Sequence, residues 1–291
     1  MKSRWMNVEM LNNFRQYLQE DEKSKATIEK YLRDMQHFWE YMMTLQADGV
    51  GKSEAFLVEK SLLLSYKLQL EKTHAVTSVN SMLASLNSFL KFVGWNDLCV
   101  KPYKIQRKIY CSQKEELTKA EYSALVQAAK DKNNERLSLV IQTICGTGIR
   151  VSELQFITVE SLQKGEALVS CKGKNRKIFI VSALRKKLLH YTKKRNILSG
   201  PVFITRTGKP LNRSNIWREM KALCEQAGVL PEKVFPHNLR HLFARTFYGI
   251  EKDIAKLADI LGHGSIETTR IYIMTTGNEH RRKMERLRLV V

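Results

Sequence analysis

The chain has 291 residues, of which 43% are hydrophobic, and it carries a formal net charge of +20 at pH 7. This length is comfortable for two domains, each with its own core. The sequence holds no run of about eighteen apolar residues and no apolar N-terminal stretch, which argues against a membrane-spanning segment and a secretory signal. Five scattered cysteines without a CxxC pair favour reduced thiols in a cytoplasmic protein and argue against a zinc site.

The positive charge is concentrated in the later part of the chain. Residues 1–107 contain 15 Lys and Arg against 12 Asp and Glu, and the chain totals of 49 and 29 leave 34 and 17 for the remainder. A strongly basic domain favours a polyanionic partner, most often nucleic acid, because bound phosphates release their counterions. Solubility or affinity for anionic lipids is the alternative explanation.

The first part of the chain has a helical pattern. Residues 24–42, 53–72 and 76–95 carry apolar side chains at steps of three and four, and Gly94 is a plausible helix end. These apolar faces are typical of a packed core. We therefore expect residues 1–107 to form a compact, all-helical domain.

A basic linker is predicted after this domain. Residues 101–116 have no clean period and are rich in Lys and Arg, so we place a linker at 108–116 and a second domain at 117–291. The second domain opens with Thr118 and Glu121, which are spaced as a capping box before an apolar helix.

The second domain is expected to be mostly helical with a small antiparallel sheet, which makes the fold class mainly α. A buried helix is predicted to end at the glycines of ERLSLVIQTICGTG, and ALVSC and KIFIV favour a hairpin around KGKNR. VFIT at 202–205 is a further candidate strand. The remaining helices are predicted near residues 183–197, 214–227, 237–248 and 253–260.

Arg150 is the first candidate for chemistry. In GTGIRVSEL, Gly146 and Gly148 are expected to break the helix and place Arg150 beside a tight turn. Its guanidinium can present two parallel donors to a phosphate, and Glu153 is spaced to orient it. An ordinary surface ion pair is the alternative.

A second arginine lies near a predicted helix start in FPHNLRHLFARTF. Pro236 suits a first helical turn, and His237 and Arg240 are three residues apart and so share one helical face. His241 lies about a hundred degrees round the helix from Arg240, and we expect it to point elsewhere.

Two further segments add candidates. Lys172 and Lys174 lie at the tip of the predicted hairpin. A lysine there can reach into an active site, and a solvated surface charge is the alternative. In LADILGHGSIETTRIYIM, His263 follows Gly262 at a forced turn, and Tyr272 lies nine residues later. Tyr272 is either a nucleophile or a packed aromatic, which is the more common role of a buried tyrosine. Thr268 and Thr269 are expected to begin or line the next short helix.

The sequence contains no acidic triad, no HExxH and no Walker loop, so neither a metal nor another cofactor is expected. A protein that breaks phosphodiesters without metal needs another source of positive charge. Arginines, a lysine and histidines can supply it.

Four segments in order resemble the catalytic boxes of the tyrosine recombinases, also called phage integrases. They are GTGIRVSEL, CKGKNRKIFIV, PHNLRHLFA and LGHGSIETTRIY. The resemblance runs over nearly the whole chain, because the helical first part is also similar to the family's core-site DNA-binding domain.

The resemblance implies roles for particular residues. Two arginines would clamp the scissile phosphate, a hairpin lysine would act as general acid toward the leaving 5′ oxygen, two histidines would hydrogen-bond the phosphate, and a tyrosine would be the nucleophile. In this sequence the two arginines are Arg150 and Arg240, and the hairpin lysine is Lys172. The two histidines are His237 and His263, and the tyrosine is Tyr272. Lys172 matches the family's Lys-Gly turn. Because Lys174 and Lys177 lie close by, which of these lysines corresponds to the family's hairpin lysine stays open.

The implied chemistry agrees with elementary electrostatics. A free tyrosine has a pKa of about 10, and nearby guanidinium groups favour the phenolate and stabilise charge on a five-coordinate phosphorus. Attack would give a 3′-phosphotyrosyl link and free a 5′-hydroxyl. The link retains the bond energy, so no ATP is needed.

The family also implies an assembly in the bacterial cytoplasm. The two domains would close round duplex DNA, four protomers would synapse two sites, and the tail after Tyr272 would dock on a neighbouring protomer, with accessory DNA-bending or directionality proteins as further partners. The chain begins directly with the core-binding-like helices, so we expect a simple, Xer-like type without an arm-binding domain. Integration, excision, inversion and resolution of chromosome dimers are all compatible with the sequence.

Two other functions remain open at this stage. A type IB topoisomerase would use the same chemistry but rejoin the same strand. A non-catalytic DNA-binding regulator with the same fold would form no covalent adduct with DNA.

Overall fold

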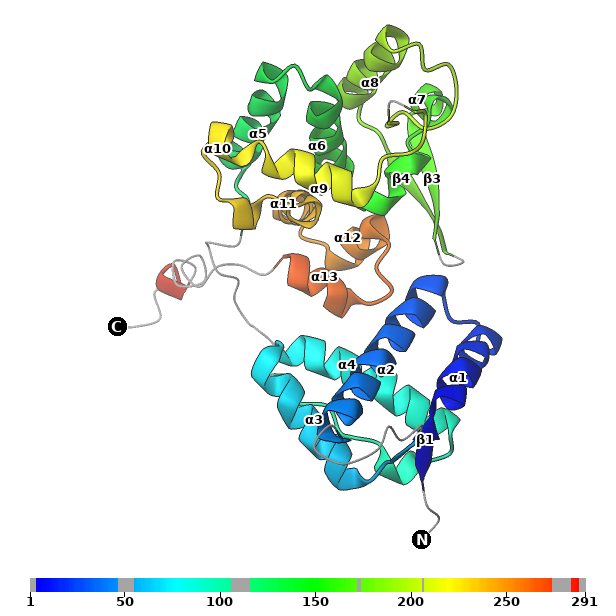
Figure 1. Ribbon diagram of the computed structural model, residues 1–291. Helices are drawn as coiled ribbons and strands as arrows, with labels where there is room; N and C mark the ends of the chain where they lie inside the picture. The colour runs from blue at the N-terminus through cyan, green and yellow to red at the C-terminus, as the bar shows by residue number, and fades with distance from the viewer. Residues whose placement is uncertain are drawn as a thin grey trace. The chain divides into compact units, whose positions relative to one another are not determined.

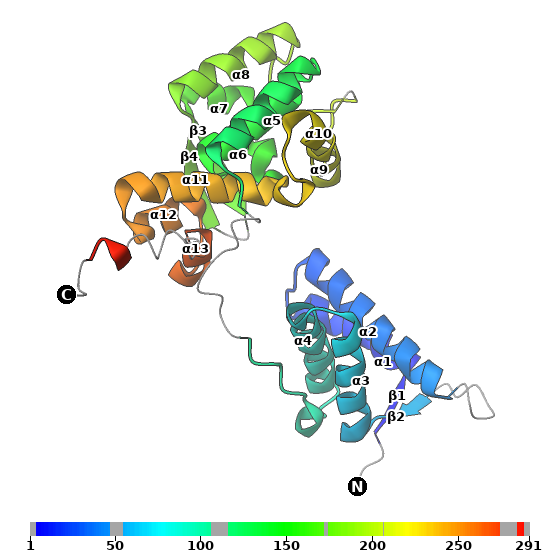
Figure 2. The ribbon, with the colours of Figure 1, turned by 90° about the vertical axis from the view of Figure 1, so that its left-hand side faces the viewer.

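The computed structural model describes residues 4–46, 55–105, 116–171, 174–205, 207–273 and 284–287. The chain divides into two compact units, Met1–Arg107 and Lys108–Val291, which are described separately (Figures 1 and 2). The structure confirms a mainly helical fold with small antiparallel sheets. None of the described helices is long and apolar enough to span a membrane.

The N-terminal unit is built round four helices. They are α1 (Val8–Glu20), α2 (Lys25–Gln46), α3 (Lys60–Thr73) and α4 (Val76–Phe92), followed by the 3₁₀ turn η1 (Asn96–Leu98). Helix α4 packs against α1, α2 and α3, and its apolar stripe lies in the core, where Phe89 meets Phe14 edge to face at 5.3 Å. Gly94 follows α4 with a φ of 76°, as expected for a glycine at a helix end.

A small sheet in this unit was not expected. Strand β1 (Trp5–Asn7) pairs antiparallel with β2 (Ala55–Leu57), so the helix predicted from residue 53 begins only at Lys60. The reason is burial on one face of the pair. Met6 and Phe56 are register partners in the core, and Phe56 meets Trp39 edge to face at 4.7 Å.

The second unit begins with two antiparallel-packed helices, α5 (Lys119–Asp131) and α6 (Glu135–Thr147). The structure confirms the capping box, since the Thr118 hydroxyl accepts from the Glu121 amide and the Glu121 carboxylate accepts from the Thr118 amide. Gly146 lies inside α6, and Gly148 alone ends it, with a φ of 65°. The break that was expected at both glycines therefore occurs at the second.

The predicted hairpin is present. Strand β3 (Glu166–Cys171) pairs antiparallel with β4 (Lys174–Phe179), and the pair packs on η2 (Val151–Phe156) and α7 (Val159–Lys164). Residues 202–205 do not form a strand in the structure. Ile204 makes only an isolated bridge to Pro210.

The rest of the unit is helical. Helix α6 is central and contacts α5, α8, α9 and α11, while α11, α12 and α13 follow one another along one side of the unit (Figure 1). Pro236 is the first residue of α11, as expected. The bounds are α8 Ser182–Lys194, α9 Arg213–Lys221, α10 Cys224–Ala227, η3 Pro231–Lys233, α11 Pro236–Glu251, α12 Ile254–Leu261 and α13 Ile266–Tyr272.

Candidate active site

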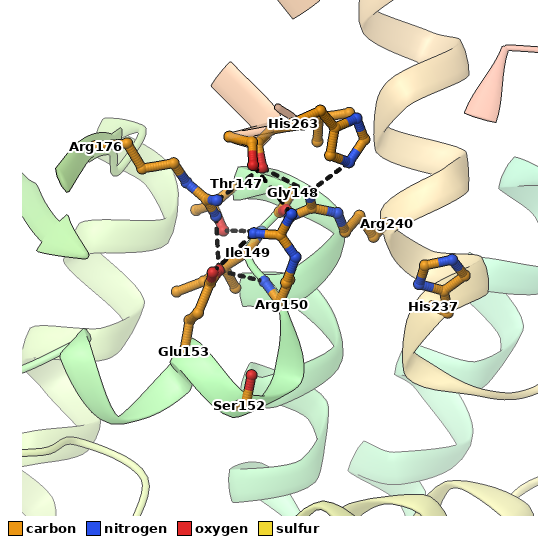
Figure 3. A network of polar contacts seen from close by, with 12 residues as sticks. Thr147, Gly148, Ile149, Arg150, Ser152, Glu153, Arg176, His237, Arg240 and His263 are labelled. Atoms are coloured by element: carbon orange, nitrogen blue, oxygen red, sulfur yellow. Dashed lines mark hydrogen bonds and ion pairs between the residues drawn. The ribbon is translucent and has the colours of Figure 1, made fainter. Parts of the chain in front are cut away.

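Segments that are far apart in the sequence meet at one place in the second unit. The turn after α6, strand β4, the first half of α11 and the turn between α12 and α13 each contribute polar side chains to a single network (Figure 3). The structure thus brings five of the six predicted site residues together. They are Arg150, His237, Arg240, His263 and Tyr272.

Arg240 lies at the centre of this network and is 1% exposed. One terminal nitrogen donates to the Gly148 carbonyl, and the other donates to the Leu261 carbonyl at 2.6 Å and approaches Nε2 of His263 at 3.0 Å. Its Nε has no hydrogen-bond partner among the described residues. Burial lowers the pKa of Arg240 to about 10, so it remains a cation at pH 7. No carboxylate pairs with it directly among the contacts that the structure describes, so its charge is not locally neutralised.

Arg150 presents its guanidinium to solvent beside this buried cation. Its side chain is 37% exposed, and it donates to Oε1 of Glu153 at 2.9 Å and to the carbonyl of Gly262 at 3.1 Å. Glu153, 2% exposed, also accepts from the backbone amide of Arg150. The contact expected between these two residues is therefore confirmed, and the carboxylate fixes the direction of the guanidinium.

His263 is held as a neutral imidazole of defined tautomer. Because Arg240 can only donate, Nε2 of His263 accepts, and Nδ1 carries the proton and donates to the Thr269 hydroxyl at 2.8 Å. Burial, followed by the charges of Arg240 and Arg150, lowers the pKa of His263 to about 4. The imidazole is therefore uncharged at neutral pH.

Tyr272 lies against this network. Its ring centroid is 5.7 Å from Cζ of Arg240 and 4.7 Å from the His263 ring, and its hydroxyl is 3.4 Å from Nδ1 of His237. The ring is 6% exposed and also packs with buried aliphatic side chains of α11 and α12. The two interpretations of Tyr272 are thus compatible, because the body of the ring is packed while its hydroxyl faces imidazole.

The expectation that His241 points elsewhere was wrong. Its ring stacks on Tyr272 with centroids 4.1 Å apart and an interplanar angle of 7°, and it meets the His237 ring at 4.7 Å. His241 does lie about a hundred degrees round α11 from Arg240. It also lies four residues after His237, however, and so shares the face of α11 that carries His237. Burial, followed by the charge of His237, lowers the pKa of His241 to about 3.

Arg176 on β4 is a site residue that the sequence interpretation missed. It donates to Oε2 of Glu153 at 2.6 Å and to the Leu261 carbonyl at 2.7 Å. The sequence pattern could have identified it, because Arg176 lies two residues before the buried Ile178 on β4 and so faces the same side of the strand. A charged residue on the inner face of a hairpin strand indicates a buried partner.

Three predictions lie wholly or largely outside the described residues. The basic linker at 108–116 is described only at residue 116. Lys172 is not described, and for Lys174, the first residue of β4, only the backbone is described. The tail after residue 273 is described only at 284–287. No cluster of three or more potential metal-binding side chains occurs within the described ranges.

Comparisons with known proteins identify the family of the chain. The model of the phage integrase family matches residues 115–279. The chain is 29% identical to the tyrosine recombinase XerA of Pyrococcus furiosus over 100% of this chain and 98% of that protein, and 27% identical to the tyrosine recombinase XerD of Halalkalibacterium halodurans over 91% and 93%.

The fold is shared with a solved structure of a lambda integrase dimer bound to a COC′ core site. The TM-score is 0.71 at 17% identity, covering 94% of this chain and 97% of that one. The family match alone spans more than half of the 291 residues, and the chain therefore belongs to the phage integrase family, the tyrosine recombinases.

Proposed function

We propose that this protein is a site-specific DNA recombinase that cleaves and rejoins duplex DNA through a covalent bond between Tyr272 and a 3′ phosphate. The observation that carries the proposal is the placement of the Tyr272 ring beside the buried guanidinium of Arg240, in the same network as Arg150 and His263. Preorganised cations and donors at this point suit the charge that develops on an attacked phosphate.

The two arginines form the phosphate site, and His263 supports Arg240 beside it. Arg150 offers an exposed guanidinium whose direction is set by Glu153, and Arg240 supplies a buried positive charge. Both bind to the carbonyls of the Leu261–Gly262 turn, which places His263 beside them. A phosphate bound here meets guanidinium groups whose positions are already fixed, while His263, whose ring nitrogens bind Arg240 and Thr269, holds Arg240 in place.

His237 is the base nearest to the nucleophile. Its Nδ1 lies 3.4 Å from the Tyr272 hydroxyl, a separation that is typical of a catalytic contact before substrate binds. Burial, followed by the charges of Arg240 and Arg213, lowers the pKa of His237 below its usual value, so the ring is a neutral acceptor at pH 7. We propose that His237 accepts the proton of the Tyr272 phenol. Lys172 is assigned the transfer of a proton to the leaving 5′ oxygen, on the resemblance of its motif alone.

The partner is double-stranded DNA. The relatives are named tyrosine recombinases XerA and XerD, and the lambda integrase structure is described as a dimer on a core site. For this chain we propose two domains that close round a recombination site, residues 1–107 and 117–291, and four protomers in the synapse, with accessory DNA-bending or directionality proteins. Both the high net charge and the fold support a DNA partner.

A nicked suicide DNA site tests the chemistry. The nick lets the short strand beyond the cleaved phosphate diffuse away, so that the covalent complex accumulates. We expect a protein–DNA adduct that resists denaturing electrophoresis with the natural chain and none with Tyr272→Phe. Absence of an adduct with the natural chain would support a non-catalytic DNA-binding protein instead.

Strand exchange separates recombination from relaxation. Two duplexes with different labels are incubated with the protein, and we expect products that join one label to the other. A topoisomerase of type IB would form the adduct but reseal each strand to itself.

A further inference from the structure

Arg176 shares one buried carboxylate with Arg150. Oε1 of Glu153 accepts from Arg150 at 2.9 Å, and Oε2 accepts from Arg176 at 2.6 Å (Figure 3). The Glu153 side chain is 2% exposed and that of Arg176 is 13% exposed, so water does little to screen this second pair. A single buried anion is thus divided between two guanidinium groups.

This sharing of the Glu153 carboxylate determines the net positive charge that the site presents to a phosphate. Arg150, Arg176 and Arg240 supply three positive charges and Glu153 one negative charge, so these four residues retain two positive charges at pH 7. Without Arg176 the same carboxylate would offset the charge of Arg150, and one positive charge would remain. A bound phosphodiester starts with a single negative charge, and attack by a phenolate adds another.

We infer that Arg176 is a positioning residue for strand cleavage, because by occupying Glu153 it leaves Arg150 effectively cationic toward the scissile phosphate. The inference rests on the proposed recombinase function and assigns a role to the inner face of β4. Arg176 is also among the cations that lower the pKa of His263, after burial, Arg240 and Arg150. Its charge therefore reaches the groups that surround the phosphate site.

A purely structural role makes a different prediction. Arg176 also donates to the Leu261 carbonyl at 2.7 Å and so helps to fix the turn before His263. If that bond were its whole contribution, removing the charge of Glu153 would not compensate for the loss of Arg176. If the charge is what matters, the compensation should be large.

The experiment measures the rate of adduct formation on the nicked DNA site at saturating protein, together with the dissociation constant for DNA and the melting temperature. The variants are Arg176→Met, Arg176→Lys, Glu153→Gln and the double variant Arg176→Met/Glu153→Gln. The matched control is Lys194→Met, which removes the same charge from the last residue of α8, where the side chain is 59% exposed and pairs with Glu135.

We expect Arg176→Met to slow adduct formation by about 10- to 100-fold with less than about a threefold change in DNA affinity, as for the loss of one charge near a reacting centre. Arg176→Lys should retain most of the rate. The double variant should recover at least about tenfold relative to Arg176→Met, since the cycle isolates the coupling between the two side chains. Lys194→Met should react like the natural chain.

Three outcomes would overturn the inference: an unchanged rate in Arg176→Met, a double variant no faster than Arg176→Met, or a folded Arg176→Lys as slow as Arg176→Met. All three presuppose that the natural chain forms the adduct. If it forms none, the proposed function itself fails, so the two failures are told apart by the natural chain alone.

Discussion

At the scale of single residues, the turn between α12 and α13 has little room. Gly262 has a φ of 63°, and a Cβ added there would lie 2.5 Å from Nη1 and 2.7 Å from Cδ of Arg176. The turn also gives its carbonyls to Arg150 and Arg240. A side chain at this position would therefore displace a guanidinium as well as strain the backbone.

Gly262→Ala is expected to slow adduct formation about tenfold and to lower the unfolding free energy by about 1–2 kcal/mol, the usual strain of a left-handed conformation. Gly228→Ala is the matched control, because Gly228 has a φ of 64° but nothing within 4 Å of the added Cβ. Both variants carry the same backbone strain, and only the first moves Arg176. Equal rates in the two variants would mean that the packing of Arg176 on this turn is irrelevant to the reaction.

The tautomer of His263 depends on one buried hydroxyl. Thr269 is fully buried and accepts from Nδ1 of His263 at 2.8 Å. Thr269→Val keeps the shape and removes the acceptor, so we expect a loss of about 1–2 kcal/mol in stability and a roughly tenfold slower adduct. Thr268→Val, on the exposed side of α13, should change neither quantity. Kinetics on the nicked site and chemical denaturation measure both effects.

At the scale of elements, the sequence predicts what depends on local pattern and misses what depends on distant partners. The capping box of Thr118, the hairpin and most of the helices follow from periodicity and turn residues, and the structure confirms them. The helix expected near 214–227 is divided into α9 and α10. The pairing of β1 with β2 joins segments about fifty residues apart, and neither strand has a pattern of its own. Residues 202–205 look like a strand locally but find only an isolated bridge.

The same distinction applies to the site. Motif order was enough to select Arg150, Arg240 and His263, whose contacts the structure describes. Arg176 and His241 were missed because their roles arise from what β4 and α11 face after folding. The register of a strand and the packing of a helix against α13 are tertiary facts that a motif does not contain.

The packing of α11 against α13 predicts a pH dependence of stability. His241 is stacked on Tyr272, and its pKa of about 3 in the folded chain lies below the value of about 6.5 expected when unfolded. The unfolded chain thus takes up the proton first as pH falls. The stabilising contribution is complete above about pH 6.5 and is lost as pH falls toward 3. His263 acts in the same direction.

His241→Phe keeps a ring on Tyr272 and removes this titration. From pH 7 to pH 4 we expect the natural chain to lose about 3 kcal/mol more unfolding free energy than the variant. Urea denaturation across this pH range, with near-ultraviolet circular dichroism as the signal, provides the comparison. Parallel pH profiles for the two chains would show that His241 is not buried as a neutral ring.

At the scale of the whole molecule, the N-terminal unit has the features of an independent domain. Its core is continuous over α1 to α4 and includes the β1–β2 pair. A buried polar group is also satisfied within it, because Asp34 accepts from Ser85 at 2.6 Å and pairs with Lys30 at 2.6 Å. We predict that residues 1–107 fold without the rest of the chain.

The fragment 1–107 is therefore expected to be helical by circular dichroism and to unfold cooperatively. Phe89→Ala removes a fully buried ring at the centre of this core and should lower the unfolding free energy by about 3–5 kcal/mol. Leu68→Ala, on a residue that is 58% exposed on α3, should change it by less than about 0.5 kcal/mol. A gradual melt, or equal effects of the two substitutions, would mean that the unit needs the rest of the chain to order its core.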